Sequence, residues 1–197
     1  FSVFMICFSI AFKMNENLRT MAPADLLLAC RYDPAGGEQM RGMDELLQDA
    51  GVDTRMFKDT AEVTVYLAPE WEDENEINVF ANIGEIVGIS DYNKLAKVYG
   101  MEKQSLADDE YFVVANYPWS IQYYDRQYLS QDHVITLHEK SYHPKYKECR
   151  DGILRMSYIP ENLGYTVVPD QAVSGGKLEM DKRCYIANYN VKNAQKK

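Results

Sequence analysis

The histidines are the first residues to test for chemistry, because the chain holds only three, at positions 133, 138 and 143. The segment HEKSYH places His138 and His143 on either side of Glu139, which invites comparison with the zinc-binding HExxH helix. These two histidines lie five residues apart, one more than in that motif. A spacing of five separates side chains by about 140° on a helix and places them on opposite faces of a strand. We therefore predict no metal site.

Other signatures of catalysis are absent from the sequence. It contains no GxSxG nucleophile elbow, no GxxxxGK[ST] phosphate loop and no GxGxxG turn after a strand. No local signature supports a catalytic cysteine either. We therefore predict that the chain is not an enzyme, has no catalytic residues and binds no cofactor.

The cysteines and the charge limit the classes of partner. Cys7, Cys30, Cys149 and Cys184 form no CxxC pair, which argues against a zinc site or a dense disulfide framework. One bridge among the last three stays open for a chain outside the cell. With 30 acidic residues against 21 lysines and arginines and a net charge of −9, the chain lacks the basic excess that phosphate binding requires. We predict no nucleic-acid partner.

Aromatic residues provide the candidate binding surface. The segment PWSIQYYDRQY at 118–128 contains Trp119, Tyr123, Tyr124 and Tyr128, and helical spacing would bring three of them near one face. Trp71 lies in the acid-rich segment PEWEDENEIN at 69–78, which lacks the spacing and central glycine of a calcium loop. Tyr and Trp are favoured in binding patches but are also common in cores and at their rims, so both interpretations stay open.

Apolar periodicity and turn residues predict the fold class. They indicate strands at 24–33, 61–67, 85–90 and 110–117, and helices at 38–50 and 90–100. Two strand–helix–strand units, at 24–67 and 85–117, predict an α+β fold with a mixed sheet and helices on one face. The expected domain spans 23–191, with a second lobe at about 118–163, and a polar tail at 192–197 follows it.

The chain opens with FSVFMICFSIAF, twelve residues without a charge. A core element, the apolar region of a signal peptide and part of a transmembrane helix are the three interpretations. As a helix this run spans about 18 Å, whereas a bilayer core is about 30 Å thick. Because the run has no polar face and lacks the flanks of a signal peptide, the pattern favours a membrane-helix stub. We expect residues 1–22 to form the end of a transmembrane helix and its linker.

Two segments carry a resemblance to a known family. VGISDYNKLAKVYGMEKQSLADDEYFVVAN at 87–116 and GYTVVPDQAV at 164–173 resemble the extracytoplasmic domain of FtsX-like permeases, the membrane subunits of MacB-type ABC transporters. The start of the chain, with its apolar run, NENL and APADLLL, is similar as well. The quoted motifs determine fold and not catalysis, so no functional residue of the family is carried over.

The resemblance implies a domain on the outer side of a bacterial cell membrane, held between two transmembrane helices. It implies a separate cytoplasmic ATPase subunit as partner, lipid around the N-terminal helix, and a peptide or lipoprotein ligand. Hydrolysis inside would drive export, lipid or lipoprotein handling, or peptide sensing and resistance outside. The alternative is a membrane-anchored or secreted module that binds a ligand or protein through the aromatic residues Trp71, Trp119, Tyr123, Tyr124 and Tyr128.

Overall fold

A mixed β-sheet organises the residues that this computed structural model describes, which are 24–31, 42–67, 85–115, 133–148, 150–151, 164–176 and 178–190. Nine strands take part, in the order β1-β9-β2-β3-β8-β4-β6-β5, and β7 pairs with β4 beside β6. The α+β class with a mixed sheet is thus confirmed. The strands are β1 (Leu26–Arg31), β2 (Phe57–Leu67), β3 (Glu85–Gly88), β4 (Glu110–Ala115), β5 (Ile135–Leu137), β6 (Lys140–Pro144), β7 (Arg150–Asp151), β8 (Gly164–Val168) and β9 (Met180–Tyr189).

The sheet contains both antiparallel and parallel pairs. The strands β1, β9, β2 and β3 pair antiparallel in that order. Next, β3 pairs parallel with β8, and β8 pairs antiparallel with β4. Outside β4, the hairpin of β5 and β6 and the short β7 complete the sheet. Strands from region 118–163 therefore join the same sheet as the rest of the chain.

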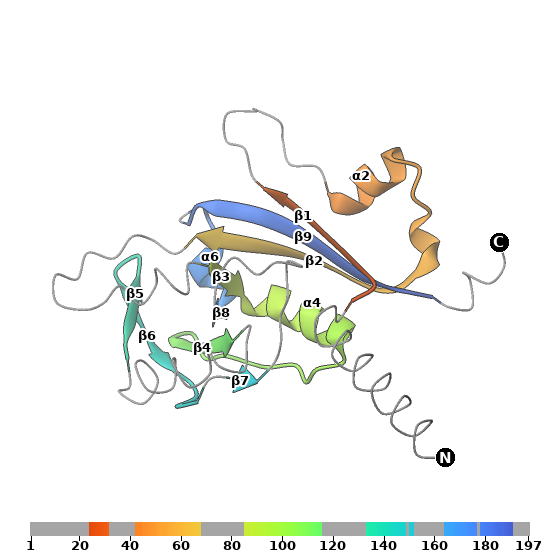
Figure 1. The fold of residues 1–197 in the computed structure, drawn as a ribbon. Coiled ribbons are helices and arrows are strands. Elements are labelled where there is room, and N and C mark those ends of the chain that lie inside the picture. The colour runs from red at the N-terminus through yellow and green to blue at the C-terminus, as the bar shows by residue number, and fades with distance from the viewer. Residues whose placement is uncertain are drawn as a thin grey trace, which may run out of the picture.

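Helices cover both faces of the sheet, so the expectation that they share one face is wrong. Helix α4 (Ile89–Tyr99) packs with Val63 of β2 and Ile186 of β9 in the largest apolar cluster. Helix α2 (Met43–Asp49) packs against Tyr185 and Ala187 of β9. Because successive strand residues point to opposite faces, α2 and α4 lie on opposite sides, as Figure 1 shows.

The short helix α6 (Asp170–Val173) lies on the face opposite α4. Its Ala172 and Val173 join Ile86 of β3 and Val168 of β8 in a second cluster. The β5–β6 hairpin packs into the same cluster through Ile135, Leu137 and Tyr142. Since α4 covers Val87 and Val167 on the other face, β3 and β8 are buried on both sides.

Two irregularities interrupt the ladder between β2 and β9. The register shifts at one end between Phe57 and Asp59, and at the other end between Val65 and Tyr66. Lys58 is the extra residue on β2 at the first shift, and Asp181 is the extra residue on β9 at the second. The first bulge explains why Phe57 packs in the cluster that includes α2, whereas Ala61, four residues further along β2, packs in the cluster that includes α4. An inserted residue changes the face of every side chain beyond it.

The 3-10 turn η2 (Thr54–Met56) leads into β2. Among the described residues, no helix is long and apolar enough to span a membrane. The expected membrane-helix stub at residues 1–22 lies outside those residues.

Candidate functional site

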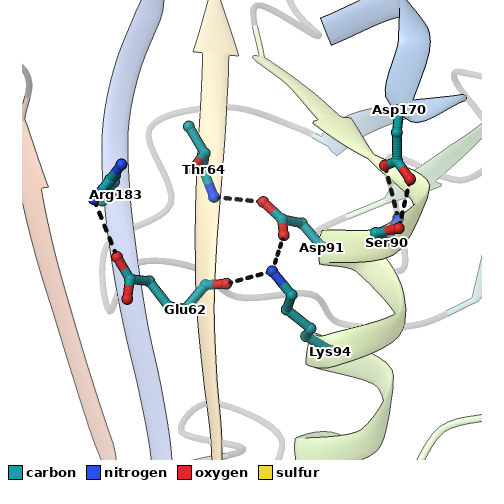
Figure 2. A network of polar contacts seen from close by, with 7 residues as sticks. All are labelled: Glu62, Thr64, Ser90, Asp91, Lys94, Asp170 and Arg183. Atoms are coloured by element: carbon teal, nitrogen blue, oxygen red, sulfur yellow. Dashed lines mark hydrogen bonds and ion pairs between the residues drawn. The ribbon is translucent and has the colours of Figure 1, made fainter. Parts of the chain in front are cut away.

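The N-terminus of α4 is held by a carboxylate from a distant part of the sequence. This helix begins at Ile89 and its N-cap residue is Gly88. Asp170, from the start of α6, accepts a hydrogen bond from the Ser90 backbone N–H at 3.0 Å and another from the Ser90 hydroxyl. A carboxylate satisfies the unpaired N–H groups of a helix start and is stabilised by the helix dipole. The cap thus joins α4 to α6 (Figure 2).

The close approach of Asp170 explains the glycine that precedes the helix. A Cβ added at Gly88 would lie 2.7 Å from Oδ1 of Asp170 and 3.2 Å from Cγ2 of Val173. The backbone of Gly88 has φ of −70°, which any residue adopts. Space, and not backbone conformation, therefore requires glycine at this position.

Side chains of α4 contact backbone N–H and C=O groups of β2 in the part of that strand with which β3 no longer pairs. Strand β3 pairs only with residues 65–67 of β2. Beyond that point Asp91 accepts the Thr64 backbone N–H at 2.8 Å, and the Lys94 ammonium approaches the Glu62 carbonyl oxygen at 3.5 Å. Asp91 and Lys94 also form an ion pair at 2.6 Å. Covering exposed strand groups in this way protects an edge from unwanted pairing.

On the opposite face of this ladder, Glu62 forms a second ion pair with Arg183 of β9, at 3.3 Å. Both side chains are partly exposed. The seven residues of this network, drawn in Figure 2, come from β2, α4, α6 and β9. Each of the drawn contacts joins groups of the fold to one another, so the arrangement holds elements in place.

A second polar group lies buried on the face of the sheet that α4 covers. The Lys182 ammonium of β9 contacts the Glu85 carboxylate of β3, and their side chains are 4% and 7% exposed. The contact passes across β2, since Lys182 is opposite Val65 and Val65 is opposite Val87. Asp181 lies 3.4 Å from the same ammonium. A buried charge is stable only when it is paired, and this pair joins β9 to β3 across β2.

The pKa shifts around this pair follow from burial and its charges. Burial tends to lower the pKa of Lys182, but the hydrogen bond to Glu85 and the charges of Glu85, Asp181 and Cys184 together raise that pKa. Burial and then the Glu85 charge raise the pKa of Tyr165 well above its ordinary value. Burial raises the pKa of the Cys184 thiol to about 12, with the Lys182 charge opposing the change. A thiol so hard to ionise is a poor nucleophile at neutral pH.

The residues singled out from the sequence fall mostly outside this region. The aromatic residues Trp71, Trp119, Tyr123, Tyr124 and Tyr128 all lie outside the described residues. His138 occupies the exposed turn between β5 and β6, while His143 lies in β6. Within the ranges that the structure describes, no group of three or more potential metal ligands is found.

The sequence reasoning missed Glu85, Lys182 and Asp170. Each carried a signal: Glu85 and Lys182 occur in strands that are otherwise largely apolar, and Asp170 follows a proline after a buried strand. A charge within an apolar strand indicates a buried partner, but the sequence does not identify that partner. Compared with known proteins, the chain matches no family model, no curated protein and no solved structure.

Proposed function

We propose that the chain is the non-catalytic extracytoplasmic domain of an FtsX-like ABC transporter permease. It couples ATP hydrolysis by a separate cytoplasmic subunit to export, lipid or lipoprotein handling, or peptide sensing outside a bacterial membrane. The observation that carries the proposal is the position of the first and last described strands, which lie side by side and run in opposite directions.

The two strands bring the ends of the domain together. Leu26, at the start of β1, is opposite Ala187, near the end of β9. The Tyr189 backbone N–H donates to Oδ2 of Asp25 at 2.8 Å, which extends the contact beyond the ladder. The chain therefore enters β1 where it leaves β9. This arrangement suits a domain held between two membrane helices, because both helices can approach it from the same end.

The segments that resemble the permease family form one continuous unit. Residues 87–116 contribute the end of β3, all of α4 and β4, and residues 164–173 contribute all of β8 and α6. The strands β3 and β8 are parallel neighbours, and Asp170 of the second segment caps α4 of the first. This packing favours the resemblance, since motifs that determine a fold should contact one another.

The mechanism that we propose is mechanical. Movement of the membrane helices acts on the adjoining ends of β1 and β9. The long ladder between β9 and β2 and the buried Lys182–Glu85 contact carry that movement to β3 and β8. The polar network at the start of α4 then keeps the helix aligned with the sheet. The domain moves as a rigid body and presents or releases its ligand.

Fractionation of the full chain tests membrane attachment. We expect the chain expressed in bacteria to remain with membranes after a carbonate wash. Deletion of residues 1–12 should move it to the soluble fraction with an unchanged melting temperature. A large fall in melting temperature would instead place the apolar run in the core of the domain.

Purification of the parent protein from detergent-solubilised membranes tests the partner. We expect a subunit with Walker motifs to copurify and to hydrolyse ATP, and transport or resistance to be lost when the domain is cross-linked to the membrane helices. A parent protein with a single membrane helix and no ATPase would refute the proposal. That outcome would favour the anchored ligand-binding module.

A further inference from the structure

The ladder between β2 and β9 contains two registers, and the bulges separate them. Outside the bulges, Phe57 is opposite Tyr189 and Tyr66 is opposite Met180. These two pairs belong to one register, because the same number of residues separates them along each strand. Between the bulges the pairing is displaced by one residue, so that Val65 is opposite Lys182. Without either bulge, the ladder would keep a single register from end to end.

The displaced register decides which side chains of β9 face α4. In the structure, Lys182, Cys184 and Ile186 share a face with α4. In the bulge-free register their neighbours Asp181, Arg183 and Tyr185 would take that face, because a slip of one residue exchanges the two faces of a strand. The displaced register requires two interruptions of an otherwise regular ladder. A preference for this register must therefore come from the β9 side chains that exchange faces.

Apolar burial alone distinguishes the two registers poorly. Residues 184–187 of β9 have the sequence CYIA, and all four are almost completely buried. Two of them face α4 and two face α2. An exchange of faces would still bury an apolar pair on each side. A strand with apolar residues at successive positions therefore lacks the alternation that normally fixes register.

The outer ion pair does not distinguish the registers either. Glu62 pairs with Arg183 on the face opposite α4. In the bulge-free register Arg183 would leave that face and Lys182 would replace it. A cation would still be available to the Glu62 carboxylate. The partly exposed pair is therefore satisfied in both arrangements.

The buried Glu85 carboxylate distinguishes the two registers. In the displaced register Glu85 contacts Lys182. In the bulge-free register Lys182 would turn to the other face, whereas Asp181, whose carboxylate lies 3.4 Å from the Lys182 ammonium in the structure, would be opposite Val65 and stay near Glu85. Arg183, the cation that this face would gain, would be opposite Val63, one pair further from Glu85. The Glu85 carboxylate would therefore lose the cation that it contacts and keep a like charge nearby. Like charges in a buried site repel strongly, and an unpaired buried charge is among the costliest defects in a fold.

We propose that the buried Glu85–Lys182 pair is a register lock that selects the displaced β2–β9 ladder over a bulge-free alternative encoded in the same sequence. The lock holds β9 with Cys184 facing α4. Reversal of the charge at position 85 would favour the bulge-free register, because the new cation would repel Lys182 and attract Asp181. This inference does not depend on the proposed transport function.

The natural Cys184 allows disulfide trapping to read the register in the full chain. In the displaced register Cys184 is opposite Val63, whereas Glu62 is opposite Tyr185 on the other face. In the bulge-free register Cys184 would be opposite Glu62. Directly opposed strand residues meet the distance requirement of a disulfide, and residues on opposite faces do not. The reporters are therefore Val63→Cys for the displaced register and Glu62→Cys for the bulge-free one.

Each reporter is combined with native Glu85, with Glu85→Lys and with the charge-swapped pair Glu85→Lys/Lys182→Glu. After mild oxidation, mass spectrometry of the linked peptides identifies each bridge to Cys184. In Glu85→Lys we expect the ratio of Glu62→Cys to Val63→Cys bridging to rise about tenfold, which corresponds to about 1.4 kcal/mol between the registers. The charge-swapped pair should lower this ratio again but only part of the way, because the cation at position 85 can then pair with the carboxylate at position 182 in the displaced register or with Asp181 in the bulge-free one.

An unchanged ratio in a folded Glu85→Lys chain would overturn the proposal. Circular dichroism establishes whether that variant folds. If it does not, Glu85→Gln decides the question, because it removes the charge and keeps the shape of the side chain. The same ratio should then rise by a smaller factor, and no rise in Glu85→Gln would also overturn the register lock.

Discussion

The two polar regions beside α4 hold the same helix and sheet by different means. At the N-terminus of α4, Asp170, Asp91 and Lys94 complete backbone hydrogen bonds at the helix start and along the edge of β2, in partly exposed positions. At the other region, Glu85 and Lys182 form an ion pair within the core. The first region supplies partners that water could also supply. Water cannot replace a partner of the buried ion pair in the second region. Loss of one of its charges should therefore lower the free energy of unfolding far more.

Removal of one partner of the buried pair should have the largest effect. Lys182→Met leaves the Glu85 carboxylate buried without its cation, and we expect the free energy of unfolding to fall by about 3–5 kcal/mol. Urea unfolding of the chain followed by circular dichroism measures this change. The double variant Glu85→Met/Lys182→Met is the matched control and should recover most of the loss, because it buries no charge. A double variant as unstable as the single one would contradict this account.

Substitution of Gly88 should have the next largest effect, at the boundary of the exposed region. Gly88→Ala places a Cβ within 2.7 Å of the Asp170 carboxylate, and crowding of this kind costs about 1–3 kcal/mol. Thermal unfolding measures the loss. In an Asp170→Ala background the same substitution should cost much less, because the crowding atom is gone. Equal costs in the two backgrounds would show that Asp170 is not the cause.

Alkaline pH should weaken the buried region specifically. The pKa of Cys184 is raised to about 12 from 9.0, so the unfolded chain loses its thiol proton first. The thiol's contribution is complete below pH 9.0 and is lost as the pH rises toward about 12, by roughly 1 kcal/mol at pH 10. The raised pKa values of Lys182 and Tyr165 act in the same direction. Melting temperatures measured from pH 7 to pH 10 should therefore fall less steeply for Cys184→Ala, and parallel curves would refute the assignment.

Loss of the exposed ion pair should have the smallest effect. Lys94 is 53% exposed at its side chain, and pairs of this kind contribute about 0.5 kcal/mol or less. Lys94→Met should therefore change the melting temperature only slightly, and added salt should reduce the difference further. Asp91→Ala should cost more, because it also removes the acceptor of the Thr64 N–H. A larger effect for Lys94→Met than for Asp91→Ala would reverse this ranking.

Local signals in the sequence were sufficient for the central elements. The apolar spacing of residues 90–100 predicted a helix, which the structure places at Ile89–Tyr99 with Gly100 at its end in the left-handed conformation, φ 69°. Strand β4 also follows its apolar run. These elements depend on side-chain spacing and on backbone preferences within a few residues, so the sequence reports them directly.

Long-range relations were not predictable in the same way. Asp170 caps a helix that begins some 80 residues earlier, and Lys182 contacts a carboxylate 97 residues before it. The candidate aromatic residues stay a prediction, since they lie outside the described residues. The fold was expected to carry its helices on one face, because short-range patterns do not state on which side of a sheet a connection crosses.

The sequence by itself determined the acidic character of the chain, its strand and helix segments around α4, and the absence of recognisable catalytic motifs. Only the tertiary structure decided which cation of β9 turns inward. Lys182 and Arg183 are neighbours in the sequence, and the apolar run CYIA that follows them fits either face. The choice depends on the place of Glu85 in a strand two positions away in the sheet, because a buried charge stabilises only the register that brings its partner within reach.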